Sequence, residues 1–432
     1  MKHSQPAKGE ARPLPPGSGA PEVDALVLGA GVVGMCTAYA LARRGLSVAL
    51  VDAASGPAQG TSFANGAQLS YAYTDALAQP SLLRKIPAMI AGLDPAFRVR
   101  LSADPAFLRW GLSFLRNCSD ARFSANTLAA LQLGLESRAA MADLQARHAF
   151  DFAHATTGKL HIFRDAEALE RAKRVAVMKQ VAGAEQFILT RQEAIDVEPA
   201  LIDTQGFDGA LWTPSEEVGD PHRFCLGLLE VLRKQYAVRD HFNFSIAKLE
   251  RCGDRMLVHD NQGRSLAGRS AVVCLGADAP RFLGRLGIRA PIRPMKGYSF
   301  TVPPGSNAPS VSLTDTGRKI VFCRLGSSMR IAGLAELDNR DLRVEPARLS
   351  ALVEGARQSM PLAADYEAIG EGWAGLRPMT PDSRPIIRQA APGLFLNIGH
   401  GMLGWTFAAG SAERVAALVN AARARTPHFE TV

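Results

Sequence analysis

Three glycines and one aspartate near the start of the chain have the spacing of a dinucleotide-binding turn. The stretch Gly29-Ala-Gly31-Val-Val-Gly34 follows an apolar run, Ala25–Leu28, and Asp52 stands eighteen residues beyond the last glycine. The first glycine permits a tight turn, the second lets a pyrophosphate approach the backbone, and the third lets helix and strand pack closely. The Asp52 carboxylate can accept hydrogen bonds from an adenosine ribose. Glycine-rich turns also occur without ligands, and this stretch does not decide between FAD and NAD.

A strand, a helix and a second strand must position these residues. The helical pattern runs without proline to Arg44, and Gly45 ends it because glycine takes the left-handed conformation of a helix stop. Ser47–Val51 is a second apolar run that leads into Asp52. Such runs are typical of parallel strands buried on both faces. The helix N-terminus offers free N–H groups to a phosphate, and Ala30, Val32 and Val33 complete the turn.

Composition sets the class of protein. The chain has 432 residues, of which 47% are hydrophobic and 21% charged, as in a soluble globular protein of two or three domains. Residues 1–22, rich in proline, glycine and charge, predict a disordered tail without the apolar core of a secretory signal. The six cysteines are scattered without a CxxC pair, which predicts free thiols in a reducing cytoplasm and no metal site. The net charge is +8, but the basic residues do not form a Lys/Arg run. We therefore expect a solvated basic surface and no nucleic-acid partner.

The order of elements predicts two discontinuous domains. Four strand-like segments between residues 291 and 333 indicate an antiparallel sheet, and a nucleotide-domain pattern returns near the C-terminal end. We expect an α/β (α+β) fold. In it a Rossmann-like nucleotide domain combines residues 23–80, 215–290 and 365–432, and a substrate or cap domain with a mixed, largely antiparallel sheet combines residues 81–214 and 291–364.

Residues 81–118 mix leucines, isoleucines and methionines with arginine and lysine. That mixture suits a segment that rests on an anionic membrane surface, with apolar side chains down and cations at the headgroups. Ordinary helices packed on the core explain it slightly better, and both interpretations stay open. No apolar run reaches the ~18 residues that a transmembrane helix needs.

Several motifs occur in an order that resembles the D-amino-acid oxidase superfamily. They are GAGVVG, TSFANGAQLS, VVCLGA, PMKGYSF, GLRPMTPDSRPII and NIGHGMLGWTFAAGS. Across residues 23–424 the chain is most similar to the bacterial FAD-dependent D-amino-acid dehydrogenases of the small-subunit type. One departure is Asn65-Gly66-Ala67, where many relatives have Asn-Ala-Gly.

The resemblance implies FAD and a set of residues that hold it. The glycine turn would bind the pyrophosphate and Asp52 the ribose, while the backbone of Ile246 would meet the adenine. The loop at Gly399 and the helix start at Gly404 would approach the flavin, whose reduced form is stabilised by a helix N-terminus. The other implied positions are Ser62, Asn65, Gly276, Arg377, Gly401, Met402 and Leu403. Relatives that tether FAD use a cysteine within the segment matching residues 372–381, which has none here, so we expect noncovalent FAD.

The resemblance also implies a site for an amino acid. Arg324, at the end of KIVFCR, would bind the substrate carboxylate as a bidentate guanidinium, and Tyr298 in KGYSF could donate a hydroxyl to it. Lys296 would face the flavin or cap its strand, and His400 would polarise the flavin, accept a proton or be structural. Arg377 would stand at the flavin edge or form an ion pair. No general base is evident, which fits direct hydride transfer from a neutral amine.

The expected activity is oxidation of free D-amino acids to 2-oxo acids and ammonia, with electrons passed to a quinone or another carrier. The alternatives are a secondary-amine oxidase or dehydrogenase for sarcosine, glycine, D-proline or hydroxyproline, and a flavin-binding protein without turnover. The expected location is the cytoplasm or the inner face of the cytoplasmic membrane, reached through residues 81–118. Side-chain preference, acceptor and oligomeric state stay open at this point.

Overall fold

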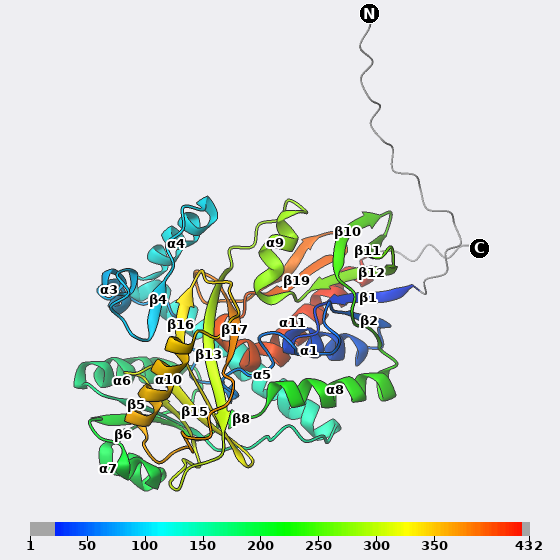
Figure 1. Cartoon of the computed structure of the whole chain (residues 1–432). Helices are drawn as coiled ribbons and strands as arrows, with labels where there is room; N and C mark the ends of the chain where they lie inside the picture. Colours follow the sequence, from blue (N-terminus) through cyan, green and yellow to red (C-terminus); the bar gives the residue numbers. More distant parts are fainter. Residues whose placement is uncertain (1–21, 426–432) are drawn as a thin grey trace, which may run out of the picture.

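The glycine turn belongs to the first of two large sheets. The computed structural model describes residues 22–425 (Figure 1). The first sheet has the order β10-β11-β12-β1-β2-β9. β19 pairs with the C-terminal end of β12, and β18 pairs with β19. Its central strands are parallel, and their segments Ala25–Leu28, Val48–Val51 and Ser270–Val273 are buried, which explains the apolar runs in their sequences. The strands are β1 (Val23–Leu28), β2 (Val48–Val51), β9 (Arg239–His241), β10 (Ile246–Cys252), β11 (Arg255–Asp260), β12 (Ser265–Val273), β18 (Ile386–Ala391) and β19 (Leu394–Ile398).

Helices cover one face of this sheet and carry most of its core. In Figure 1, α1, α8 and α11 lie beside β1 and β2, and α5 runs along the far side of α11. Their apolar faces form one cluster with the sheet, in which Met35, Phe224, Phe395 and Ala416 are fully buried. The helices are α1 (Val32–Ala42), α5 (Asp120–Arg147), α8 (Pro221–Tyr236) and α11 (Gly404–Ala424), while the short α9 (Ala279–Gly284) packs on the other face.

The second sheet is mixed and largely antiparallel, as predicted. Its order is β17-β13-β16-β15-β14-β5-β7-β6, with β4 added beside β16. Among the described strand pairs of this second sheet, only β14–β5 and β16–β4 are parallel. The strands are β4 (Phe97–Val99), β5 (Lys159–Phe163), β6 (Phe187–Thr190), β7 (Gly209–Thr213), β13 (Arg293–Val302), β14 (Ser312–Asp315), β15 (Ile320–Leu325), β16 (Ser328–Leu337) and β17 (Trp373–Met379).

Each face of the second sheet has a different neighbour. The helix α10 (Pro346–Ser359) covers one face over β13, β15 and β16, and the other face turns toward the first sheet. Near the far edge lie α6 (Ala166–Val181), α7 (Arg191–Val197) and the 3₁₀ turn η1 (Pro199–Asp203). A two-stranded sheet of β3 (Gln68–Leu69) and β8 (Glu217–Val218) lies between the large sheets, and short 3₁₀ turns follow β12 (η2, Gly276–Asp278) and β19 (η3, Gly401–Leu403).

Residues 80–117 form α2 (Pro80–Leu83), α3 (Ile86–Ile90), β4 and α4 (Pro105–Asn117). The inward face of α4 packs Phe107, Trp110 and Phe114 against Met295 and its neighbours. On the opposite face of α4, Leu108, Leu112 and Leu115 are exposed at helical spacing, so this helix has apolar side chains on two faces. The first face confirms that these helices pack on the core.

The fold class predicted from the sequence is confirmed, and the division into two domains stays a prediction. All strands of the first sheet come from the three segments assigned to the nucleotide domain. Two elements pack across the expected boundaries, because β17 belongs to the second sheet and α5 packs on α11. The six cysteines are free thiols, and all but Cys252 are buried. Most of the predicted tail, residues 1–21, lies outside the described residues, as do residues 426–432.

None of the helices between residues 22 and 425 combines the length and apolar character needed to cross a membrane.

Candidate active site

A cavity of about 2310 Å³ separates the two large sheets. Its walls include the residues that follow the carboxyl ends of β1, β2 and β12, namely Gly29, Asp52 and Cys274. Parallel α/β sheets bind ligands at this edge. The opposite wall includes Ser299, Ala332 and Val321 of the second sheet, and the lining also extends to α10 at Ala351 and Gly355. The volume exceeds the several hundred Å³ of a site for one small molecule, so it can hold a dinucleotide together with a substrate.

The glycine turn has the close packing that its sequence predicts. Gly29 has φ +106°, which favours glycine, and a Cβ on Gly34 would overlap the Gly29 carbonyl oxygen and lie 2.8 Å from its carbonyl carbon. Ser62 Oγ accepts a hydrogen bond from Val32 N at 3.1 Å, which brings the loop after β2 onto the first turn of α1. Asp52 accepts hydrogen bonds from Ala30 N at 2.6 Å and Ala54 N at 2.8 Å and lies at the cavity wall.

A second backbone turn closes the cavity from the C-terminal side. Gly399 and Gly401 have φ of +79° and +57°, and η3 then leads into α11, which begins at Gly404 and runs for 21 residues. The N-terminal end of α11 meets the cavity at Leu403 and Gly404. A long helix with its N-terminus at a cavity favours negative charge there.

Most of the residues predicted to hold the cofactor line this one cavity. Ala30, Gly34 and Gly399 do not line the cavity. They belong to the two backbone turns that border it. The lining residues among those predicted are Gly29, Gly31, Val32, Val33, Asp52, Ser62, Asn65, Ile246, Gly276, Arg377, Gly401, Met402, Leu403 and Gly404.

His400 lies in the cavity wall with its ring fixed from behind. Ser411 Oγ donates to the Ala408 carbonyl at 3.2 Å and lies 3.0 Å from His400 Nε2. The other ring nitrogen, Nδ1, has no hydrogen-bond partner among residues 22–425. Burial lowers the His400 pKa to about 3, so the ring is neutral.

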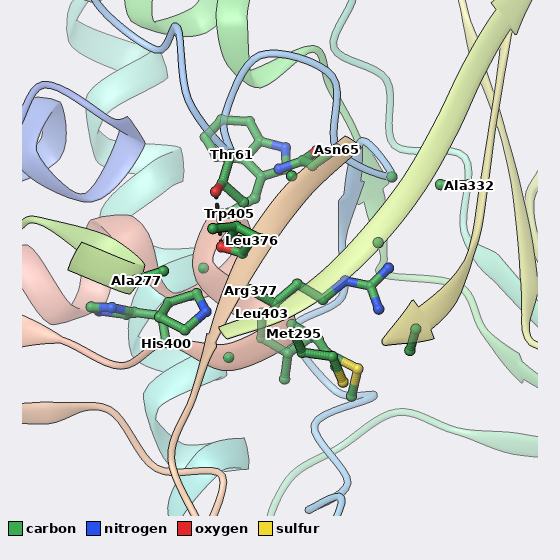
Figure 2. A pocket seen from close by; sticks show the side chains of 18 of the residues that line it. Thr61, Asn65, Ala277, Met295, Ala332, Leu376, Arg377, His400, Leu403 and Trp405 are labelled. Carbon is green, nitrogen blue, oxygen red and sulfur yellow. Dashed lines mark hydrogen bonds between the residues drawn. The ribbon is translucent and has the colours of Figure 1, made fainter. Parts of the chain in front are cut away.

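Arg377 is a partly buried cation without a counter-charge among the described residues. It comes from β17, and Figure 2 shows its side chain extending across β13 toward the side of Ala332. Its guanidinium makes no hydrogen bond or ion pair with any residue between 22 and 425, and it lines the cavity. Burial lowers the Arg377 pKa to about 10. An anion entering the cavity would therefore gain a charge-assisted bidentate partner.

Arg324 does not reach the cavity, which corrects its assignment as the carboxylate-binding residue. It lies at the hairpin end of β15, its side chain is exposed, and its Nε donates to the Gly326 carbonyl at 3.4 Å. The cavity meets β15 near its start, at Ile320 and Val321. The strand therefore carries the arginine past the site and into solvent.

Lys296 and the hydroxyl of Tyr298 are also placed away from the substrate position that we expected. Both side chains lie on the α10 side of β13, because successive residues of a strand point to opposite faces. Lys296 Nζ donates to the Arg343 carbonyl at 2.6 Å, and Tyr298 Oη donates to Glu336 Oε1 at 3.0 Å. Tyr298 still borders the cavity through other atoms. These contacts give both residues a structural role.

Several lining residues belong to the family motifs but were not predicted as site residues from the sequence. Gly297 faces the cavity between Lys296 and Tyr298, and Arg377 lies against it. Thr61 Oγ1 donates to the Leu376 carbonyl at 2.9 Å, which ties the phosphate loop to β17 (Figure 2). Trp405 also lines the cavity, and its Nε1 donates to the Gly219 carbonyl at 3.1 Å. Strand alternation would have found Gly297, once the face toward the cavity was known.

Comparison with known proteins identifies the family. Residues 24–418 match the family model described as FAD dependent oxidoreductase. This protein belongs to the FAD-dependent oxidoreductases. D-amino acid dehydrogenase 2 of Ralstonia nicotianae is 39% identical over 91% of this chain and 95% of its own length. D-amino acid dehydrogenase of Paramagnetospirillum magneticum is 39% identical over 91% of this chain and 94% of its own length.

Solved structures share the fold. Glycine oxidase from Geobacillus kaustophilus superimposes with a TM-score of 0.72 at 19% identity, covering 93% of this chain and 95% of that one. L-proline dehydrogenase from P. horikoshii superimposes with a TM-score of 0.72 at 18% identity, covering 93% and 94%. At these identities the likeness concerns the fold alone.

The residues present fit FAD, the cofactor of this family. Gly31 lines the cavity, and a Cβ there would meet only Ser62 Oγ at 3.5 Å, so a pyrophosphate can approach its backbone. Gly34 leaves no room for a side chain, which lets α1 pack closely, and Asp52 stands at the cavity wall. The volume and the α11 N-terminus suit the remainder of the molecule. Cys274 is the cysteine among the described lining residues, and burial raises the pKa of its thiol to about 12.

Proposed function

We propose that this FAD-dependent oxidoreductase is a D-amino-acid dehydrogenase. It oxidises free D-amino acids to imino acids, which water hydrolyses to 2-oxo acids and ammonia. The curated relatives named D-amino acid dehydrogenase match at 35–39% identity over nearly their whole length, which supports this substrate class. Within the cavity, FAD supplies an acceptor for the hydride from the substrate Cα.

The observation that carries the proposal is the unpaired guanidinium of Arg377. A free amino acid is an anion at its carboxylate, and a partly buried cation without a partner at the cavity wall is the group that would bind it. The bidentate pair would fix the substrate orientation, and the cavity would bury the rest of the molecule. The assignment of Arg377 to the substrate replaces that of Arg324.

His400 and α11 would act on charge in the same site. His400 is neutral, and its Nδ1 can form a hydrogen bond with the substrate amine or with the cofactor. The α11 N-terminus would stabilise negative charge that develops on the reduced cofactor. The glycine turn, Ser62 and Asp52 would hold the phosphates and the ribose.

The test is anaerobic reduction of the purified holoprotein, followed by flavin absorbance. D-Alanine should bleach the flavin and L-alanine should not. Bleaching by sarcosine or D-proline alone would assign the protein to secondary amines, and no bleaching by any of the four would contradict turnover of these classes. Arg377→Met should lower kcat/KM for D-alanine by about a hundredfold or more, since it removes a charged hydrogen-bond pair. Arg324→Met, the matched control, should stay within twofold.

We further propose that electrons leave to a lipid-soluble quinone and that residues 83–116 contact the inner face of the cytoplasmic membrane. On α4, Leu108, Leu112 and Leu115 are exposed on one face. Leu83, Ile90, Leu93 and Leu101 are exposed on the same segment. The exposed cations among them are Arg84, Lys85, Arg98, Arg100, Arg109 and Arg116. Apolar side chains flanked by cations suit an anionic lipid surface.

Flotation with vesicles tests this contact. The holoprotein should float with vesicles that contain phosphatidylglycerol and less with pure phosphatidylcholine, because each cation near an anionic surface contributes about 1 kcal/mol. Leu108→Glu with Leu112→Glu should abolish flotation. The control pair Val177→Glu and Val181→Glu, on exposed positions of α6, should leave it unchanged. Equal flotation of both pairs would contradict the assigned surface.

A further inference from the structure

Arg377 and Met295 form a cross-strand pair on the cavity face of the second sheet. The register places Met295 of β13 opposite Arg377 of β17, and both residues line the cavity (Figure 2). The Cβ atoms of such a pair lie about 4.5–5.5 Å apart. The guanidinium leans over the next residue of β13 on this face, Gly297, where a Cβ would lie 2.6 Å from Arg377 Cζ. A carboxylate bound to Arg377 would therefore have Met295 as a neighbour.

The loop after β2 covers the cavity face of the second sheet on one side of the guanidinium. Ser299 Oγ donates to the Ala64 carbonyl, and a Cβ on Gly66 would lie 3.2 Å from Val321 Cγ2. Along β13, Ser299 and Met295 lie on opposite sides of the residue that supports the guanidinium, because the side-chain period of a strand is two. The loop therefore directs a substrate side chain toward Met295.

A bulge in β16 shapes the sheet on the Met295 side. Leu334 has φ +55°, and the register between β16 and β13 shifts at this point. Beyond the bulge β16 no longer pairs with β15 and takes β4 as its neighbour, with Ala335 opposite Phe97. Ala335, Phe97 and Met295 belong to one apolar cluster. The change of partner strand therefore adds an alanine and an aromatic ring to the wall beside Met295.

Apolar side chains line this part of the cavity, which we call the Met295 lobe. Its lining residues carry no charge, and they belong to one apolar cluster or pack against it: Leu77, Leu82, Met89, Phe97, Met295 and Ala335. Beside Phe97, the Asp94 carboxylate is paired with Lys319 at 2.8 Å, and the exposed Lys85 also borders the cavity. An ammonium group that entered the lobe would lose its hydration without gaining a counter-charge.

The lobe is within reach of a substrate held by Arg377. Met295 and Gly297 are two residues apart on β13, which is about 7 Å along a strand. An extended chain advances about 3.5 Å in three bonds, so the last methyl of D-norleucine lies roughly 6 Å from its carboxyl carbon. That methyl reaches the Met295 side chain, whereas the methyl of D-alanine stays beside the guanidinium.

We propose that the Met295 lobe is the subsite for the substrate side chain, and that it selects apolar side chains of three or four carbons over a methyl group and over cationic side chains. The inference rests on the proposed function, because it takes Arg377 as the carboxylate site. It adds the substrate class within D-amino acids and names Met295 as a residue that determines it. The unbranched thioethers of Met295 and Met89 adapt to side chains of different shape.

Three D-amino acids test the lobe by turnover. We expect kcat/KM for D-norleucine to exceed the values for D-alanine and D-lysine by at least tenfold. Met295→Ala should reduce the ratio of the D-norleucine value to the D-alanine value by about tenfold. Met329→Ala is the matched control, because Met329 is equally buried, on β16, and does not line the cavity. In this control the ratio should stay within twofold of the wild type.

A binding measurement on the wild-type holoprotein separates this inference from the proposed function. Acetate and pentanoate are titrated against the flavin absorbance of the oxidised protein. Each buried methylene group lowers Kd by about fourfold, so pentanoate should bind at least tenfold more tightly than acetate. If no D-amino acid is turned over but pentanoate keeps this advantage, the lobe stands and the proposed function fails. Equal Kd values for the two acids, or an unchanged ratio of kcat/KM in Met295→Ala, would overturn the lobe.

Discussion

The guanidinium of Arg377 rests on the backbone of Gly297, where a Cβ would lie 2.6 Å from Cζ and 2.9 Å from Nε. Gly297→Ala should therefore displace Arg377 and raise KM for D-alanine by about tenfold, with a smaller effect on stability. Steady-state kinetics and a melting curve measure the two effects separately. Gly284→Ala is the matched control, since a Cβ there meets nothing within 4 Å. Equal KM values for the two variants would contradict the contact.

The neutral state of His400 predicts how stability depends on pH. Its pKa is about 3 in the folded protein against 6.5 ordinarily, because burial disfavours the charged form. Above pH 6.5 both states are neutral and the group contributes nothing. Below it only the unfolded chain binds the proton, so the free energy of unfolding falls by about 1.4 kcal/mol per pH unit.

Urea unfolding between pH 7.5 and 5 measures this loss. His400→Gln, which stays neutral throughout, should have a shallower dependence on pH than the wild type. His222→Gln, at a partly exposed position, should retain the wild-type slope. Identical slopes for all three proteins would mean that His400 binds its proton equally in the folded and unfolded states, which would contradict its lowered pKa.

Tyr298 should matter to stability and not to substrate binding. Its hydroxyl donates to the buried carboxylate of Glu336, which also pairs with Arg348 at 2.8 Å. Tyr298→Phe removes one hydrogen bond to a charged group, so unfolding free energy should fall by about 1.5–3 kcal/mol. KM for D-alanine should stay within twofold. A tenfold rise in KM without a loss of stability would restore Tyr298 as a carboxylate partner.

The flavin should leave the protein on acid precipitation. The one cysteine of the described cavity wall, Cys274, has a thiol whose Sγ donates to Thr37 Oγ1 at 3.7 Å and whose pKa burial raises to about 12. A thiol of that kind is a weak nucleophile. The supernatant after acid treatment should therefore be yellow and the pellet colourless. A yellow pellet would show a covalent link.

Local patterns were sufficient to predict the nucleotide-binding half of the molecule. The glycine turn, Gly45 and the helix start at Gly404 each depend on a few neighbouring residues, and the structure places them in the expected elements. Buried parallel strands were recognisable because both faces need apolar residues. The family resemblance added the order of segments, which no local pattern contains.

The directions of the side chains on the second sheet could not be predicted, because they depend on tertiary packing that the sequence does not contain. Arg324 and Arg377 both lie on strands of the second sheet, and only the hairpin end of β15 shows that Arg324 points to solvent. Alternation on β13 groups Lys296 with Tyr298 and Gly297 with Ser299, but it does not say which pair meets the cavity. The packing of α10 on β13 decides which pair meets the cavity, because Lys296 and Tyr298 point to the α10 side of the sheet.

The hydrogen bond from Thr61 to the Leu376 carbonyl joins the loop that approaches the phosphates to the strand that carries Arg377. Two ligands that each order one side of such a contact share a coupling free energy, and this coupling is reciprocal. Cofactor loading would prepare the guanidinium for a carboxylate, and a bound carboxylate would slow the loss of the cofactor by the same factor. The protein would then keep its flavin best while substrate is abundant.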